Sequence, residues 1–230
     1  FTTLHDAWEW DGSDWVQRSA YDPIPQPGNM TFDSVRGAPI YLSTSTSKYW
    51  NGTAWIVIQD SQSNRPLVNA VAFDTHRGLA MVWDAGTRSG ALHEWDGQAF
   101  QPRVGPSPYA QTGATLAYDS RRGITVFTGD QGTWEWDGVR FLHQGPGVSV
   151  SEHAAAYDSV RQVTDIFGGT PYIFGVYTWD GTQATPIFTP PPSVREHAGM
   201  VFDENRGVGV MFGGQDVYNG PYRGDTWEWN

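Results

Sequence analysis

The chain has 230 residues, no cysteine, and a net charge of −11 from 14 basic and 25 acidic side chains. A field of that sign repels phosphate backbones and anionic headgroups, which argues against nucleic acid and membrane surfaces as partners. Disulfides, thiolate metal sites and cysteine nucleophiles are excluded within these residues, and no apolar run is long enough to insert into a membrane. The 27 glycines, 15 prolines and 14% aromatic content predict many short strands joined by tight turns.

An aromatic marker recurs along the chain. It ends in tryptophan and, wherever the sequence continues, is followed by Asp-Gly or Asn-Gly. The tryptophans are Trp10, Trp50, Trp95, Trp136, Trp179 and Trp229, at intervals of 40, 45, 41, 43 and 50 residues. Five intervals of this length predict five structural repeats.

A second marker, Asp-x-x-Arg, runs in phase with the first. It begins at Asp33, Asp74, Asp119, Asp158 and Asp203. We expect each Asp and Arg to hold a tight turn by hydrogen bonds or a local ion pair; five equivalent ion or ligand sites are the functional alternative.

Each repeat predicts four short antiparallel strands and no helix. In the fourth repeat the strands are expected at His153–Tyr157, Val163–Phe167, Gly175–Trp179 and Ala184–Phe188, with a two-residue type I′ turn at Asp180-Gly181. Four strands per repeat indicate an all-β fold, a five-bladed β-propeller of four-stranded antiparallel kelch-like blades.

We expect one domain over residues 1–230. The predicted blades are 28–60, 68–103, 113–143, 152–188 and 196–230, closed by a strand pair at 5–18 whose second strand completes the fifth blade. This reading has one strand more than a closed ring needs. The extra strand would add to a blade edge, pair with a neighbouring molecule, or mark a chain cut from a longer propeller. A start at Phe1 instead of Met favours a processed or trimmed chain.

Several residues support a family resemblance. The diglycines Gly168-Gly169 and Gly213-Gly214, and the pairs Glu152-His153 and Glu196-His197, resemble the bacterial kelch-like propellers related to the galactose oxidase central domain. WD40 repeats fit less well because no Gly-His signature precedes the Trp-Asp pairs. The resemblance implies protein-binding scaffolds, carbohydrate-binding modules or, less often, enzymes, and it favours a secreted, periplasmic or cell-surface location. Galactose oxidase uses a tyrosine cross-linked to cysteine, so its chemistry does not carry over.

Strand topology separates two faces of the ring. The one–two and three–four turns are short and uniform, whereas the two–three and four–one connections on the other face are long and varied. Variable loops on a rigid scaffold usually hold binding residues. The predicted ligand-binding residues on this loop-rich face are Tyr109, Tyr172, Arg195, Asp216, Tyr218, Tyr222 and Arg223. The alternative is that these tyrosines only cover blade edges.

The most specific enzyme-like feature is the repeated Glu-His pair before strand one. Glu152, His153, Glu196 and His197 are expected near the mouth of the central channel, where they could bind a divalent metal or act as acid and base. A structural role, in which the histidine ties strand one to a neighbouring loop, is the alternative, and no cofactor is expected.

The sequence therefore favours a non-enzymatic propeller that recognises a glycan or a protein through its loop-rich face. Two alternatives stay open. One is a metal-assisted or acid–base enzyme (a lyase, isomerase or hydrolase) at the channel mouth. The other is a structural subunit of a larger assembly that associates through its terminal strands.

Overall fold

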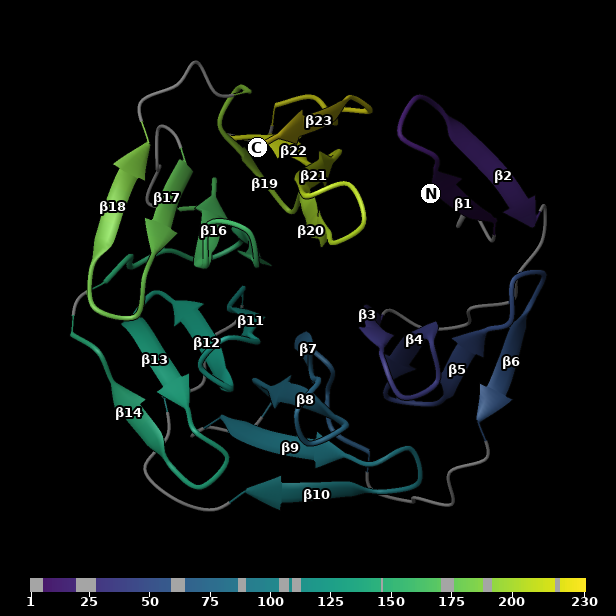
Figure 1. Ribbon diagram of the computed structural model, residues 1–230, viewed down its shortest axis with the longest axis horizontal. Helices are drawn as coiled ribbons and strands as arrows, with labels where there is room; N and C mark the ends of the chain where they lie inside the picture. The colour runs from purple at the N-terminus through teal and green to yellow at the C-terminus, as the bar shows by residue number, and fades with distance from the viewer. Residues whose placement is uncertain are drawn as a thin grey trace.

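The computed structural model of the chain describes residues 6–19, 28–58, 65–86, 90–103, 108, 113–145, 147–170, 176–187, 192–217 and 220–230. These residues form an all-β five-bladed propeller around a central opening (Figure 1). Over these ranges the chain has no helix that could cross a membrane.

Four blades are four-stranded antiparallel sheets in which consecutive strands pair from the centre to the rim. Blade one comprises β3 (Gly28–Asp33), β4 (Ala38–Ser43), β5 (Ser47–Trp50) and β6 (Trp55–Ile58). Blade two comprises β7 (Ala70–Asp74), β8 (Leu79–Asp84), β9 (Ala91–Trp95) and β10 (Phe100–Arg103). Blade three comprises β11 (Thr115–Asp119), β12 (Ile124–Gly129), β13 (Gly132–Trp136) and β14 (Phe141–His143). Blade four comprises β15 (Ala154–Asp158), β16 (Val163–Phe167), β17 (Val176–Trp179) and β18 (Ala184–Ile187).

Blade five is built from β20 (Gly199–Asp203), β21 (Val208–Phe212) and β23 (Thr226–Trp229), paired in that order. A two-stranded sheet of β19 (Arg195–Glu196) and β22 (Gln215–Asp216) belongs to its loops.

The N-terminal strands do not close the ring in the predicted way. We expected the strand near Asp14–Arg18 to complete blade five. Instead β1 (Ala7–Trp10) and β2 (Trp15–Ser19) pair with each other as a separate hairpin, which lies between β23 and blade one (Figure 1). Side chains join it to blade five: the indole of Trp10 donates to Glu228 at 2.6 Å, and that of Trp15 to Thr226 at 2.8 Å. The five repeats are confirmed as blades, and the expected pairing of the N-terminal strand with blade five is wrong.

The apolar core lies between neighbouring blades. One cluster joins Ile40 and Leu42 of blade one to Phe73, Val82 and Trp95 of blade two, and all five side chains are buried. Similar clusters join blade two to blade three and blade three to blade four. A single sheet has no partner for its flat faces, so the recurring aromatics are explained by packing between blades. Each buried side chain of this size contributes about 1.5–3 kcal/mol.

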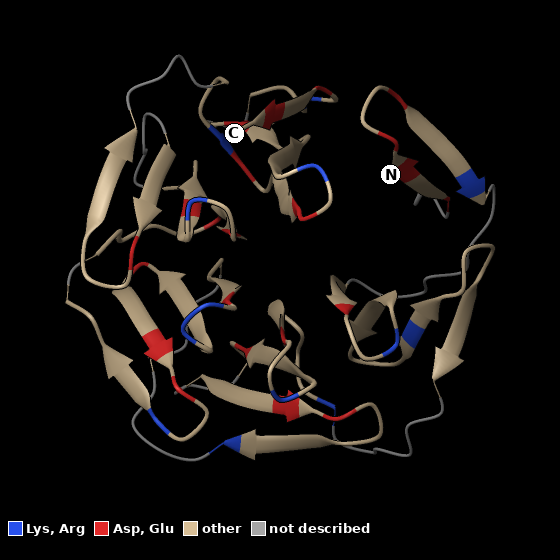
Figure 2. Cartoon of the chain, viewed as in Figure 1, with Lys and Arg blue, Asp and Glu red and all other residues tan. Residues whose placement is uncertain are grey.

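The Asp-x-x-Arg turns are structural, as predicted. Asp33 Oδ1 accepts hydrogen bonds from the amides of Val35 and Arg36 at 2.9 and 3.0 Å, while its other oxygen contacts the Arg36 guanidinium at 2.5 Å. Gly37 then takes a φ of 66°, which favours glycine. Acidic and basic residues meet in these short loops near the centre of the ring (Figure 2).

The loops between strands three and four differ from the prediction. Trp179 pairs with Ala184, so residues 180–183 form a four-residue loop, not a two-residue type I′ turn. Asp180 Oδ1 accepts from the amides of Thr182 and Gln183 at 2.8 and 2.9 Å. Because this side chain closes the turn, only Gly181 needs a positive φ.

Candidate functional site

The described ligand candidates gather at the loop-rich face of blade five. Arg195 lies on β19, Asp216 on β22, and Tyr222 and Arg223 in the connection to β23. The other three candidates, Tyr109, Tyr172 and Tyr218, lie outside the described residues.

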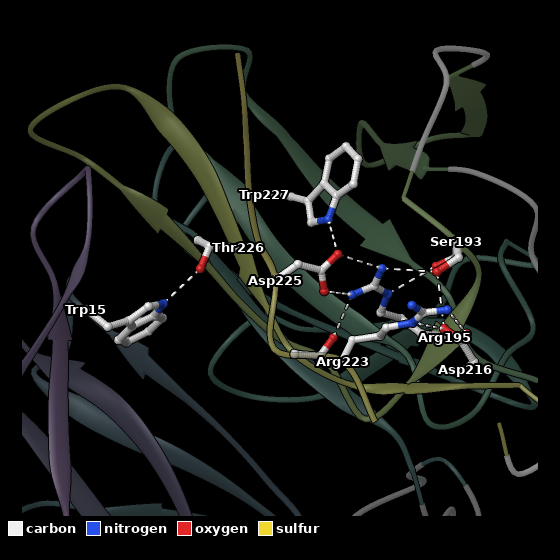
Figure 3. A network of polar contacts seen from close by, with 9 residues as sticks. Trp15, Ser193, Arg195, Asp216, Arg223, Asp225, Thr226 and Trp227 are labelled. Atoms are coloured by element: carbon white, nitrogen blue, oxygen red, sulfur yellow. Dashed lines mark hydrogen bonds and ion pairs between the residues drawn. The ribbon is translucent and has the colours of Figure 1, made fainter. Parts of the chain in front are cut away.

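Arg195 is the buried centre of this cluster, with only 2% of its surface exposed. Its Nη1 contacts Asp225 Oδ1 at 2.6 Å and donates to the carbonyl of Gly213 at 3.0 Å, while its Nε donates to the carbonyl of Ser193 at 3.1 Å (Figure 3). The hydrogen bond from Arg195 lowers the pKa of Asp225 to about 2. The guanidinium therefore ties together three segments of the fifth-blade loops.

A second ion pair lies beside the first and is more exposed. Arg223 Nε donates to Asp216 Oδ1 at 2.9 Å, and its Nη2 contacts the other oxygen, a bidentate arrangement (Figure 3). This contact lowers the pKa of Asp216. Ser193 Oγ donates to the same carboxylate at 3.2 Å, which links the two ion pairs.

Tyr222 precedes Arg223 in the chain and has 75% of its surface exposed. Its backbone is held by an antiparallel bridge to Gln215 and by the amide of Arg223, which donates to the carbonyl of Gly214 at 2.9 Å. The site thus combines an exposed tyrosine, whose backbone is held by hydrogen bonds, with an ion pair made by the residue that follows it in the chain.

Sequence reasoning missed Ser193 and Asp225, which complete this cluster. Asp225 immediately precedes the final aromatic marker, and Ser193 follows a proline run. Asp225 has a counterpart in Asp6, since each carboxylate accepts from the indole two residues further on, at 2.6 and 2.7 Å. The pairing of Asp225 with Arg195, and the contact of Ser193 with the same guanidinium, are visible only in the structure.

The repeated Glu-His pairs do not form one four-residue site. His153 is buried, and its Nε2 lies 2.7 Å from Thr115 Oγ1 and 2.6 Å from Thr128 Oγ1. Burial lowers its pKa to about 3. These contacts join the start of strand one of blade four to blade three, which is the structural role given above as the alternative.

Glu152 and His197 do contact each other, whereas their position at a channel mouth stays a prediction. His197 Nε2 lies 2.9 Å from Glu152 Oε2, and the His197 amide donates to the carbonyl of Glu152 at 3.0 Å. Both residues have left-handed backbones, with φ of 58° and 59°. Glu196 lies apart, on β19 opposite Gln215. Across the described ranges no group of three or more potential metal ligands is found.

The burial of His153 predicts an acid-dependent loss of stability. The folded pKa of about 3 lies below the ordinary value of 6.5, so below pH 6.5 the unfolded chain binds a proton that the folded chain does not. We expect this histidine to remove roughly 3 kcal/mol of stability between pH 6.5 and pH 4, at about 1.4 kcal/mol per pH unit.

Urea unfolding of the wild type and of a His153→Gln variant at pH 7.5, 6, 5 and 4 measures this contribution. The difference in unfolding free energy between the two proteins should shrink steadily towards acid pH. A difference independent of pH would show that folding does not lower the pKa of His153.

The fold and its loop cluster together define a β-propeller, a class consistent with a binding or scaffold role. No family model and no curated protein sequence matches the chain. Among solved structures it is similar to that of YjhT, with a TM-score of 0.66 and 12% sequence identity, over 97% of this chain and 88% of that chain. At this identity the likeness concerns the fold alone.

Proposed function

We propose that the chain is a non-enzymatic binding propeller that recognises a neutral or cationic glycan at the loop-rich face of blade five. The observation that carries this proposal is the exposed side chain of Tyr222, on a backbone bridged to Gln215 and next in the chain to Arg223, whose guanidinium pairs with Asp216. A tyrosine ring offers a flat apolar face with a polar edge, on which a sugar ring can stack. The neighbouring guanidinium and carboxylate supply donors and acceptors for hydroxyl groups.

The electrostatics of the chain support this choice of ligand. A net charge of −11 disfavours polyanionic glycans, which would be repelled at long range. The Arg195–Asp225 and Arg223–Asp216 pairs hold the loop in place before a ligand arrives, and preorganisation of this kind reduces the entropic cost of binding.

Glycan-array binding of the wild type and variants tests the proposal. Tyr222→Ala should weaken binding to the preferred glycan at least tenfold, because the stacking surface is lost. Tyr222→Phe keeps the ring and should stay within about threefold, since threefold is less than 1 kcal/mol. The control is Val139→Ala, which removes an equally exposed apolar side chain from the opposite face.

An array on which the wild type binds nothing would contradict glycan recognition. Glycan binding unchanged in Tyr222→Ala would contradict the assigned site. The acid–base alternative rests on a different pair, Glu152 and His197, so neither result bears on it.

A further inference from the structure

The hairpin β1–β2 contacts blade five in the way that one complete blade contacts the next. In blade three, Glu135 accepts hydrogen bonds from Arg122 of its own turn at 2.7 Å and from the indole of Trp179 in blade four at 2.9 Å. In blade five, Glu228 likewise accepts from Arg206 and from the indole of Trp10, both at 2.6 Å. The hairpin thus takes the place of strands three and four of a blade that follows blade five.

In the hairpin, Glu9 occupies the position that Glu135 and Glu228 occupy in their blades. It precedes Trp10 as Glu135 precedes Trp136, and it accepts from the indole of Trp50 in blade one at 3.1 Å. Its guanidinium partner, however, is Arg18 on β2, at 2.8 Å, and both side chains are nearly half exposed. No turn arginine among the described residues is paired with Glu9, whereas Glu94, Glu135 and Glu228 at the same position are each paired with the turn arginine of their own blade.

The glycines in the loops between strands three and four also show that a turn arginine is missing next to blade one. The turn arginine of one blade packs against the three–four loop glycine of the next, in the pairs Arg36–Gly97, Arg77–Gly138, Arg122–Gly181 and Arg206–Gly12. At Gly52 of blade one, no heavy atom of the described chain lies within 4 Å of an ideal Cβ. A cavity of about 700 Å³ lies there, and Glu9, Trp50 and Gly52 are among its lining residues.

The innermost strands leave apolar surface on both sides of the hairpin. Strands β3, β7, β11, β15 and β20 pack in succession, but in the described structure β20 and β3 do not pack in this way. Met30 and Phe32 on β3 are 61% and 57% exposed, and Val201 on β20 is 61% exposed. At the position of Phe32 in blade two, Phe73 is only 6% exposed. Apolar surface of this kind marks an interaction site.

Strand β1 also has an unpaired edge within the described chain, since its only ladder is with β2. A cavity of about 230 Å³ runs between this strand and blade one, lined by residues that include Ala7, Glu9, Met30 and Pro39. An unpaired edge beside an apolar wall is a template for an added strand.

We propose that this surface, defined by the β1 edge, Glu9, Met30, Phe32, Gly52 and Val201, binds a β-hairpin of a partner polypeptide that carries an Asp-x-x-Arg-Gly turn. The second strand of the hairpin pairs with β1, and its first strand lies between β3 and β20. The turn arginine pairs with Glu9 and lies on Gly52, as Arg122 pairs with Glu135 and lies on Gly181. The two strands and β1–β2 together make a four-stranded blade.

The occupant is a partner polypeptide and not another segment of residues 1–230. Residues 1–5 and 20–27, which adjoin the hairpin in sequence, contain no arginine. The five Asp-x-x-Arg turns are each already bonded within a blade, so a second copy has no such turn to donate without unfolding a blade. The surface shares no residue with the Tyr222 cluster, and peptide binding there does not depend on glycan binding.

A cyclised peptide with the sequence of residues 115–129, which includes the turn Asp119–Gly123, serves as the probe. Added to the 230-residue chain, it should bind saturably and slow amide hydrogen exchange over residues 7–10. The same peptide with the arginine at position 122 replaced by glutamine should bind at least tenfold more weakly. In the chain, Glu9→Gln should weaken binding by a similar factor.

Two matched variants separate the carboxylate's role from general charge effects. Arg18→Gln frees Glu9 from its present partner and should bind the peptide at least as tightly as the wild type does. Glu196→Gln removes one negative charge from a residue outside the proposed surface and should not change binding. Because Glu9 is nearly half exposed, the Glu9→Gln protein is expected to fold, which near-ultraviolet circular dichroism verifies.

Three results would overturn the proposal. The first is no protection of β1 at millimolar peptide. The second is equal binding by the glutamine peptide or by Glu9→Gln. The third is a dimer, seen by light scattering, in which residues 7–10 are already protected before peptide is added.

Discussion

Replacement of Arg122 by glutamine is expected to lower the free energy of unfolding by about 3 kcal/mol. Arg122 contacts two carboxylates, Asp119 at 2.6 Å and Glu135 at 2.7 Å, and both acids are only 3% exposed. Without the guanidinium, two negative charges remain buried near each other with hydrogen bonds that do not neutralise them. Removal of one partner from a buried ion pair is costly for this reason, even where the intact pair adds little.

The same motif in blade five provides the control. Arg206 contacts Asp203 and Glu228 in the same geometry, but those side chains are 29% and 30% exposed. Water can solvate both carboxylates after Arg206→Gln, so its effect should be much smaller. Urea titrations followed by tryptophan fluorescence measure both variants. Equal losses in the two proteins would mean that burial of the acids does not determine the contribution of the motif.

Truncation of Phe73 to alanine is expected to cost about 3–5 kcal/mol, whereas truncation of Phe32 should change stability by less than about 0.5 kcal/mol. The two residues occupy the same repeat position, since each lies on strand one and immediately precedes the aspartate of the Asp-x-x-Arg turn. Phe73 packs in the cluster between blades one and two, and Phe32 is largely exposed. Sequence pattern alone would assign them equal roles.

Thermal and urea unfolding of both variants, at several protein concentrations, checks this prediction. A large loss for Phe32→Ala would contradict the exposed placement of β3 and would show that its side chain is covered in solution. A small loss for Phe73→Ala would contradict the inter-blade core.

Part of the candidate site was accessible from the sequence, and part was not. The topological argument placed Arg195, Asp216, Tyr222 and Arg223 on one face, because strand alternation determines at which end each loop lies. It could not show that Arg195 is buried in a network with Asp225 while Tyr222 is exposed. That difference depends on how three non-repeating loops pack on one another, and no periodic pattern encodes it. The kelch-like family and the ligand remain predictions.

The sequence by itself determined the all-β class, the five repeats and the role of the Asp-x-x-Arg turns, because these depend on local spacing and on side chains that bond within a few residues. Asp33 and Arg36, for example, meet across one turn. Only the tertiary structure decided how the ring ends meet. Strand β2 could pair with β1 or with β23 of blade five, and both of those strands carry the sequence Trp-Glu-Trp. In the structure β2 pairs with β1, and the hairpin contacts blade five through the side chains of Trp10 and Trp15. Burial of Phe73 and exposure of Phe32 follow from this placement, since identical positions differ only in whether a neighbouring inner strand covers them.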